Sequence, residues 1–303
     1  MNLRQIEVFR AVMHAGSISG AAIALHVSQP AVSRLMRYLE TKLRVALFER
    51  TGGRLHPTPE ARALLREIDS AYRGIDRVRL YAEQLQHGVA DTLRITTNLS
   101  TALELVPRAI ASLKVQMPRL HISVEVATHA QITDQLLEGA CDIGVAAFVQ
   151  SQHPSVTAQA IGTGEVLCAM APTHPLARRK RLTLQDVRRY DVISFGSATA
   201  HGKVVSGLIG TGEDLPVTPT VEVRYAYVAC SIAASGWGLA LVDDLTASRF
   251  EGSGVLLRPL TPPVTYQACA MSSAERPLSS AGRELVRLLG VHWSAVRMPM
   301  RGR

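Results

Sequence analysis

The sequence predicts an α/β protein in which a small helical unit is followed by one long helix and a two-lobed α/β unit. Residues 17–37 show the pattern of two short helices joined by a tight turn. Residues 59–86 carry apolar side chains in alternating steps of four and three, which indicates one long helix. Strand and helix patterns alternate over residues 92–148, which predicts a parallel sheet covered by helices, and a second α/β unit follows. We expect three domains, at residues 1–58, 59–88 and 89–303. The last domain is expected to have two lobes, one at about 91–161 and 266–303 and the other at about 162–265.

Composition favours a globular protein with a polyanionic partner. The 303 residues suffice for two or three domains, and 47% of them are hydrophobic. The formal net charge is +8, and residues 1–87 carry 13 Lys and Arg against 8 Asp and Glu, a net of +5. This concentration of positive charge favours nucleic acid as the partner, although a charge of this size also serves general solubility.

Four cysteines stand far apart, at Cys141, Cys168, Cys230 and Cys269. They form no Cys-x-x-Cys pair and have no His at metal-ligand spacing, so we expect no metal and no cofactor. Buried reduced thiols are the expected state, with redox sensing as the alternative.

No targeting or membrane segment is expected. Arg4, Glu7 and Arg10 interrupt the charged-then-apolar pattern of a signal peptide. The longest apolar stretch, residues 232–242, is about half as long as a membrane span. We therefore expect a cytoplasmic protein without a membrane partner.

The first of the two short helices follows Ser17, whose hydroxyl can cap it. Ser28 is expected to cap the second, with Pro30 in its first turn, where a missing N–H costs nothing. Apolar residues of the second helix point inward at helical spacing, whereas Gln29, Ser33, Arg34 and Arg37 point outward. Gln and Arg can form paired hydrogen bonds with base edges, and Ser and Arg can hold phosphates. The alternative is a helical hairpin with a solvated outer face.

A short hairpin follows, with strands at residues 47–50 and 55–57. We expect Arg50 at its base and Arg54 near its tip to reach phosphates or a narrow minor groove. The alternative is a solvated turn.

The long helix starts at Thr58-Pro59-Glu60 with a cap, a proline and an acid in its first turn. Its apolar stripe is a heptad seam that a small domain cannot bury by itself, so we expect it to pair with a second copy of the helix. Packing on its own C-terminal domain is the alternative. The expected dimerisation residues are Leu64, Ile68, Ala71, Ile75, Val78 and Leu85.

In the C-terminal unit, strands are expected at 92–97, 121–128 and 141–148, with helices at 100–116 and 131–138. Further strands are expected near 165–171, 191–195, 220–223 and 238–242, and the segments 266–271 and 279–290 are expected to return to the first lobe.

Ligands of open parallel sheets bind where strands end and helices begin. The first such place offers hydroxyls and backbone N–H groups to a carboxylate or another anion. The alternative is that these Ser and Thr side chains are only helix caps. The candidate ligand-binding residues are Asn98, Ser100, Thr101, Thr128, His129, Phe195, Gly196, Ser197, Arg224 and Tyr225. Enzyme signatures such as Gly-x-Ser-x-Gly or a phosphate-binding loop do not occur in the sequence, so no catalytic residue is expected.

Motifs of the N-terminal third resemble those of the LysR-type transcriptional regulators. They are Leu3 and Phe9, Gly16-Ser17, Ala21-Ala22, the run from Ser28 to Ser33, Leu39-Glu40, Leu47-Phe48-Glu49-Arg50 and Thr58-Pro59. Arg44 stands where this family usually has a Gly after the preceding Leu, which suggests a slightly different turn. Ala61 also replaces a usual Gly and favours helix.

The resemblance implies a winged helix-turn-helix that reads an imperfect inverted repeat in promoter DNA as a homodimer or homotetramer. It also implies a periplasmic-binding-protein-like domain with a small-molecule effector in the cleft between its lobes, and RNA polymerase as a further partner. The modest polarity of the cleft positions suggests a carboxylate or an amino-acid-like metabolite as effector. The implied DNA-binding residues are Ser17, Ser28, Gln29, Pro30, Ser33, Arg34, Arg37, Arg50 and Arg54.

Two other classes of protein stay open at this point. One is a solute-binding or enzymatic α/β protein whose N-terminal domain only mediates assembly. The other is an architectural DNA-binding protein without a ligand.

Overall fold

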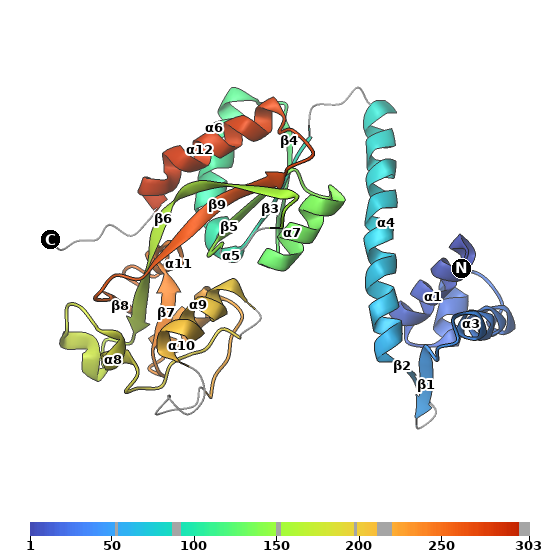
Figure 1. Cartoon of the computed structure of the whole chain (residues 1–303), viewed down its shortest axis with the longest axis horizontal. Helices are drawn as coiled ribbons and strands as arrows, with labels where there is room; N and C mark the ends of the chain where they lie inside the picture. Colours follow the sequence, from blue (N-terminus) through green and yellow to red (C-terminus); the bar gives the residue numbers. More distant parts are fainter. Residues whose placement is uncertain (52–53, 87–91, 150–152, 197–198, 211–219, 297–303) are drawn as a thin grey trace. The chain divides into compact units, whose positions relative to one another are not determined.

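The computed structural model describes residues 1–51, 54–86, 92–149, 153–196, 199–210 and 220–296 (Figure 1). The chain divides into two compact units, Met1–Val89 and Ala90–Arg303. Ser197 lies outside the described residues, as do the side chains of Arg50, Arg54 and Leu85.

The first unit packs three helices around one small core and adds a hairpin and a long helix. Its core consists of apolar side chains that recur at helical spacing, including Phe9, Val12, Val32, Leu39 and Leu47. The elements are α1 (Leu3–Ala15), α2 (Ile18–Ala24), α3 (Gln29–Leu43), β1 (Phe48–Thr51), β2 (Arg54–Pro57) and α4 (Pro59–Gln86). The two short helices, the hairpin and the long helix predicted from the sequence are therefore confirmed.

The two short helices begin in different ways. The Ser17 hydroxyl accepts a hydrogen bond from the Gly20 N–H at 3.0 Å and so caps α2. Ser28 stands at the N-cap of α3, but the expectation that its hydroxyl caps the helix is wrong. Pro30 removes one of the two N–H groups that such a cap binds, and the next one, on Ala31, donates to the Ser28 carbonyl at 3.0 Å. The exposed Ser28 hydroxyl makes no capping bond.

Arg44 ends α3 in the left-handed conformation, with φ 56°. This is the conformation that glycine favours after a helix, so the arginine does not require a different turn, contrary to the expectation from the sequence.

Two polar side chains connect α3 to the hairpin and to α4. The Glu40 carboxylate accepts hydrogen bonds from the backbone N–H groups of Leu47 at 2.8 Å and Phe48 at 3.1 Å. The Thr58 hydroxyl donates to the Ala46 carbonyl at 2.9 Å and accepts from the Ala61 N–H at 3.2 Å. Together they fix the entry of the hairpin and the first turn of α4.

The apolar stripe of α4 has two parts with different surroundings. Ile68 is buried and Leu64 half-buried in the core of the first unit, so the expectation that this unit cannot bury the stripe is wrong for its first half. Beyond that point Ala71 is exposed, and the exposed fractions of Ile75 and Val78 are 51% and 69%.

Polar contacts also hold the first half of α4 in place. The Arg10 guanidinium pairs with Asp69 at 2.8 Å and lies 4.4 Å from the ring centroid of Tyr72. Both partners stand on α4 and face α1, so this part of the helix belongs to the winged unit.

In the described part of the second unit, seven strands form a mixed sheet in the order β4-β3-β5-β9-β6-β7, with β8 also pairing with β6. The neighbours β4 and β5 are parallel to β3, whereas β9 is antiparallel to both β5 and β6. The strands are β3 (Thr92–Thr97), β4 (His121–Val126), β5 (Ile143–Ala147), β6 (Val156–Met170), β7 (Ala240–Asp243), β8 (Leu256–Pro259) and β9 (Thr265–Ser273).

The long strand β6 passes from one lobe to the other. Its first part pairs with β9, and its last part pairs with β7 and β8 (Figure 1). The expected strands at 191–195 and 220–223 form only isolated bridges, Val192 to Leu239 and Ser194 to Glu222. The parallel sheet predicted for residues 92–148 is confirmed, because β3 is parallel to β4 and β5. In the second lobe β6 pairs antiparallel with β7 and β8, whereas the isolated bridges are parallel.

Helices cover the sheet in both lobes. The expected helix over 100–116 is divided into two, α5 and α6, and α12 returns to pack on α6 as predicted. The helices are α5 (Leu99–Ala102), α6 (Leu105–Gln116), α7 (His129–Glu138), α8 (Leu184–Val187), α9 (Ala200–Ile209), α10 (Ala226–Ala234), α11 (Asp244–Ser248) and α12 (Ser280–Val296), with a 3-10 turn at Pro175–Arg178.

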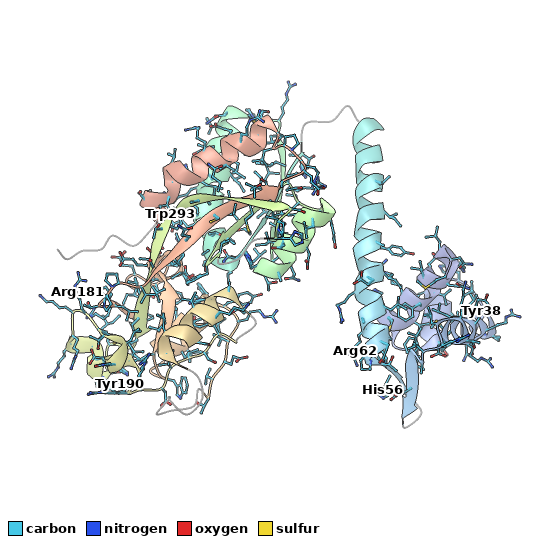
Figure 2. The ribbon with its side chains drawn as sticks, viewed as in Figure 1. Tyr38, His56, Arg62, Arg181, Tyr190 and Trp293 are labelled. Atoms are coloured by element: carbon cyan, nitrogen blue, oxygen red, sulfur yellow. The ribbon has the colours of Figure 1, made fainter. Side chains whose placement is uncertain are left out.

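Two glycines of β6 allow aromatic rings to lie on the strand. A Cβ atom at Gly162 would be 2.3 Å from Nε1 of Trp293, which is labelled on α12 in Figure 2. A Cβ atom at Gly164 would be 2.2 Å from Cζ of Tyr266. The Gly-Thr-Gly sequence at 162–164 therefore serves ring packing.

All four cysteines are free and buried. Burial raises the pKa of the Cys141 thiol to about 11 and that of Cys168 to about 12. These thiols are protonated at neutral pH and therefore poor nucleophiles. Within the described residues no helix is both long and apolar enough to cross a bilayer.

We predict that Glu40→Ala loosens the hairpin without unfolding α3. Removing the carboxylate leaves two backbone N–H groups without their acceptor, which should cost about 1–3 kcal/mol. Hydrogen–deuterium exchange of the peptide that contains Leu47 and Phe48 should accelerate accordingly. The exposed Glu49→Ala variant serves as control and should exchange like the wild type; equal exchange in both variants would contradict the assigned role of Glu40.

Candidate functional site

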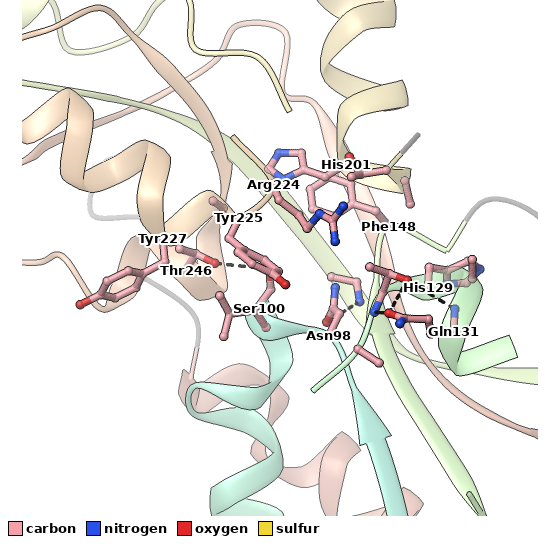
Figure 3. Close-up of a pocket in the computed structure, with 18 residues that line it drawn as sticks. Asn98, Ser100, His129, Gln131, Phe148, His201, Arg224, Tyr225, Tyr227 and Thr246 are labelled. Carbon is pink, nitrogen blue, oxygen red and sulfur yellow. Dashed lines mark hydrogen bonds between the residues drawn. The ribbon is translucent and has the colours of Figure 1, made fainter. Parts of the chain in front are cut away.

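A cavity of about 350 Å³ lies between the two lobes of the second unit (Figure 3). The first lobe contributes the segments that follow β3, β4 and β5, and the second lobe contributes the starts of α9 and α10 together with Thr246 of α11. This is the place expected from the ends of the strands, and its volume suits a small organic molecule.

Six of the ten predicted ligand-binding residues line this cavity: Asn98, Ser100, Thr128, His129, Arg224 and Tyr225. Thr101 and Phe195 do not line it, because both side chains are buried, and Gly196 is not among the lining residues either. The Thr101 hydroxyl bonds instead to Asn98 Oδ1 at 2.7 Å and to Thr97 Oγ1 at 2.6 Å.

Two of the lining residues also cap helices, the role that the sequence analysis gave as the alternative to ligand binding. Asn98 caps α5 through the Thr101 N–H, and Thr128 forms a capping box with Gln131 at the start of α7. Their polar groups are held in fixed positions at the edge of the cavity, so capping and ligand binding are compatible roles.

A buried carboxylate links the two lobes beneath two residues that line the cavity, Ser100 and Thr246. Asp243 Oδ2 accepts hydrogen bonds from the Ser100 hydroxyl at 2.9 Å and from the Thr246 hydroxyl at 3.0 Å, and Oδ1 accepts from the Thr246 N–H at 2.8 Å. Ser100 belongs to the first lobe and Asp243 to the second. Burial raises the pKa of Asp243 to about 6, and the three hydrogen bonds oppose this increase.

A stack of four rings runs from the second lobe to the first. His201 lies between Phe195 and Phe148, with ring centroids 4.1 and 4.3 Å away, and Phe148 stacks on Tyr266 at 4.4 Å. Burial lowers the pKa of His201 to about 4, so its imidazole is neutral at pH 7, and its Nε2 lies 2.9 Å from the Leu241 carbonyl. Phe148 has φ 63°, a strained conformation for an aromatic residue.

Sequence reasoning missed both Phe148 and His201 as lining residues. Phe148 could have been found, because it ends the apolar segment predicted as a strand. His201 stands two residues into a helix with no local pattern to mark it.

The outer face of α3 is the second candidate site. Gln29, Pro30, Arg34 and Arg37 are exposed on it, whereas Ser33 is half-buried and lies 3.5 Å from the Arg37 guanidinium. Tyr38, which was not predicted, extends outward from the same helix (Figure 2).

A shallow groove on this face is lined by Pro30, Arg34, Arg37, Tyr38 and Thr41. Ser17, in contrast, is half-buried and engaged in capping α2. Among the described residues no group of His, Cys, Asp or Glu side chains is placed to hold a metal ion.

Two protein families match the chain. Residues 3–62 match the bacterial regulatory helix-turn-helix protein, lysR family, and residues 86–294 match the LysR substrate binding domain. The first match lies within the first structural unit and ends early in α4, and the second spans most of the second unit.

Relatives and solved structures agree with this assignment. The regulator DgcR of Pseudoalteromonas sp is 29% identical over 92% of this chain and 95% of its own length. The octopine catabolism/uptake operon regulatory protein OccR of Rhizobium meliloti is 32% identical over 86% of each chain. The crystal structure of CbnR, a LysR family transcriptional regulator, has the same fold, with a TM-score of 0.70 at 19% identity over 98% of this chain and 100% of that one. CbnR has also been crystallised with its target DNA. This chain therefore belongs to the LysR family of transcriptional regulators, proteins that combine a DNA-binding helix-turn-helix with an effector-binding domain.

Proposed function

We propose that this regulator reads its DNA site through the outer face of α3, with Arg34 and Gln29 on base edges. The observation that carries this assignment is the exposed set of hydrogen-bonding side chains in the first half of α3. Arg and Gln can each form paired hydrogen bonds with bases in the major groove. Ser28, Ser33 and Arg37 are suited to phosphates, and so are Arg50 and Arg54 of the hairpin.

The exposed Ser28 hydroxyl supports this assignment, because it makes no capping bond in its own helix. Tyr38 and Thr41 extend the same face beyond the residues predicted from the sequence. For Ser17 we propose an indirect role, since its hydroxyl fixes the start of α2.

We infer that two copies of the chain pair through the second half of α4, so that two winged units bind the half-sites of an inverted repeat. Ile75 and Val78 support this, because they continue the stripe of α4 beyond the core of the winged unit and are exposed. Ala71 and Leu85 fall on the same stripe in the sequence. Two such dimers could form a tetramer by a further contact.

We further infer that a small molecule in the cavity between the lobes controls DNA binding. Residues of both lobes line the cavity, so a ligand there contacts both at once. It changes the balance between two arrangements of the regulator only if it binds one of them more tightly. RNA polymerase is the partner through which the bound regulator would act on transcription, and such a protein works in the cytoplasm, where the DNA is.

Arg34→Ala should weaken binding to the native promoter by about 1–3 kcal/mol, because a paired hydrogen bond to a base is lost. A gel-shift titration measures this directly. Arg66→Ala, which removes an exposed arginine from α4, is the matched control and should stay within about threefold of the wild type. If the affinity of the Arg34→Ala variant for the promoter is unchanged, Arg34 does not contact a base.

Replacing Ile75 and Val78 together with Asp should give monomers in sedimentation equilibrium, because two charges would enter the proposed helix pair. Both side chains are exposed in the single chain, so its helical content should not change. Ile68→Asp, in contrast, places a charge in the core of the winged unit and should unfold it. A stable dimer of the Ile75/Val78 double variant would disprove the role of this segment.

A further inference from the structure

We infer that the effector of this regulator is a carboxylic acid that carries no amino group, and that Arg224 is the residue that binds its carboxylate. The inference rests on the proposed effector role of the cavity. It decides between the two ligand classes that the sequence left open, a carboxylate and an amino-acid-like metabolite.

The charge of the cavity wall favours an anionic ligand. Among the described residues that line it, Arg224 is the one with a permanent charge, and none is Asp or Glu. Arg224 is exposed, and no carboxylate of the described part of the chain forms an ion pair with it. An arginine fork matches a carboxylate in geometry as well as in charge.

The surroundings of Arg224 favour an anion as well. Tyr225 precedes α10, a helix of nine residues whose start has no side-chain cap. The first N–H groups of such a helix have no partner within it, and Tyr225, Ala226 and Tyr227 all line the cavity. A carboxylate bound by Arg224 can therefore also accept hydrogen bonds from this backbone.

An ammonium group would find no counter-charge among the described lining residues. The carboxylate of Asp243, which bonds to the lining residues Ser100 and Thr246, is buried and already accepts three hydrogen bonds. It is not itself part of the cavity wall. An ammonium that enters the cavity would lose water without gaining a charged partner, which is unfavourable.

Ser100 and Thr246 can still interact with a neutral polar group. Both hydroxyls donate to Asp243, so the oxygen lone pairs that remain can accept a hydrogen bond from a ligand. A hydroxyl on the ligand satisfies them without a charge. Hydroxy acids are therefore compatible with the cavity as well as simple acids.

The ring stack defines the apolar part of the site. Phe148 and His201 each have ring partners on both faces, so it is their edges that can face the cavity. The edge of the Phe148 ring carries partial positive charge and disfavours a cation further. Tyr225, 41% exposed, supplies ring surface for the body of the ligand.

The test compares acids with their amino-acid counterparts on the full-length protein. Titration calorimetry at pH 7.5 uses 3-phenylpropanoate and 3-phenyllactate against phenylalanine, and glutarate and 2-hydroxyglutarate against glutamate. We expect at least one acid to bind tenfold or more tightly than its amino-acid counterpart, a difference of about 1.4 kcal/mol or more. Arg224→Gln should remove this binding, whereas Arg119→Gln, an exposed arginine before β4, should leave it unchanged.

Gel shifts with the native promoter separate this inference from the proposed effector role. If an amino acid binds as tightly as its acid, or if none of the four acids binds, the inference is wrong. An amino acid that binds and alters promoter binding would leave the effector role intact. An acid that binds through Arg224 without altering promoter binding would instead uphold the ligand class and overturn the effector role.

Discussion

The second unit depends on the backbone pairing of β6 with β9. These two strands run side by side from Val156 to Glu165 and are the backbone connection that the sheet provides between the lobes. Beyond this ladder, β6 continues into the second lobe and pairs with β7 and β8. The main-chain hydrogen bonds of this ladder fix the register of the two strands.

Side chains add weaker links across the same boundary. Ser100 reaches Asp243 in the other lobe, and the rings of Phe148 and His201 meet between the lobes. Each link involves a residue that also lines the cavity. A ligand that displaces or reinforces either link changes the contact between the lobes directly. Binding at a small site can in this way alter the arrangement of the whole second unit.

Much of this architecture could be predicted from the sequence, because its signals are local. Caps, helical spacing and the hairpin turn defined the winged unit and α4, and strand ends led to Asn98, Ser100 and Thr128. Other features depend on contacts between distant residues. The spacing of apolar residues predicts which side of α4 is apolar but not what packs against that side. It could therefore not show that Ile68 packs within the first unit while Ile75 stays exposed.

The same limit explains the misassigned parts of the cavity. Thr101 and Phe195 stand at strand ends as Ser100 does, but their side chains turn into the core. His201 enters the site because its ring stacks on Phe148 from another lobe, and no local pattern encodes that contact. The segments 191–195 and 220–223 were expected to be strands, yet they form only the isolated bridges Val192 to Leu239 and Ser194 to Glu222.

The left-handed turn at Arg44 has a consequence for the evolution of this chain. A non-glycine residue in this conformation costs about 1 kcal/mol relative to glycine, and the exposed Arg44 side chain has no packing to offset it. Replacing Arg44 with glycine, a single codon change, should therefore raise the free energy of unfolding by about this amount without disturbing the core. Selection for growth at higher temperature should find glycine here, unless the charge of Arg44 is itself under selection.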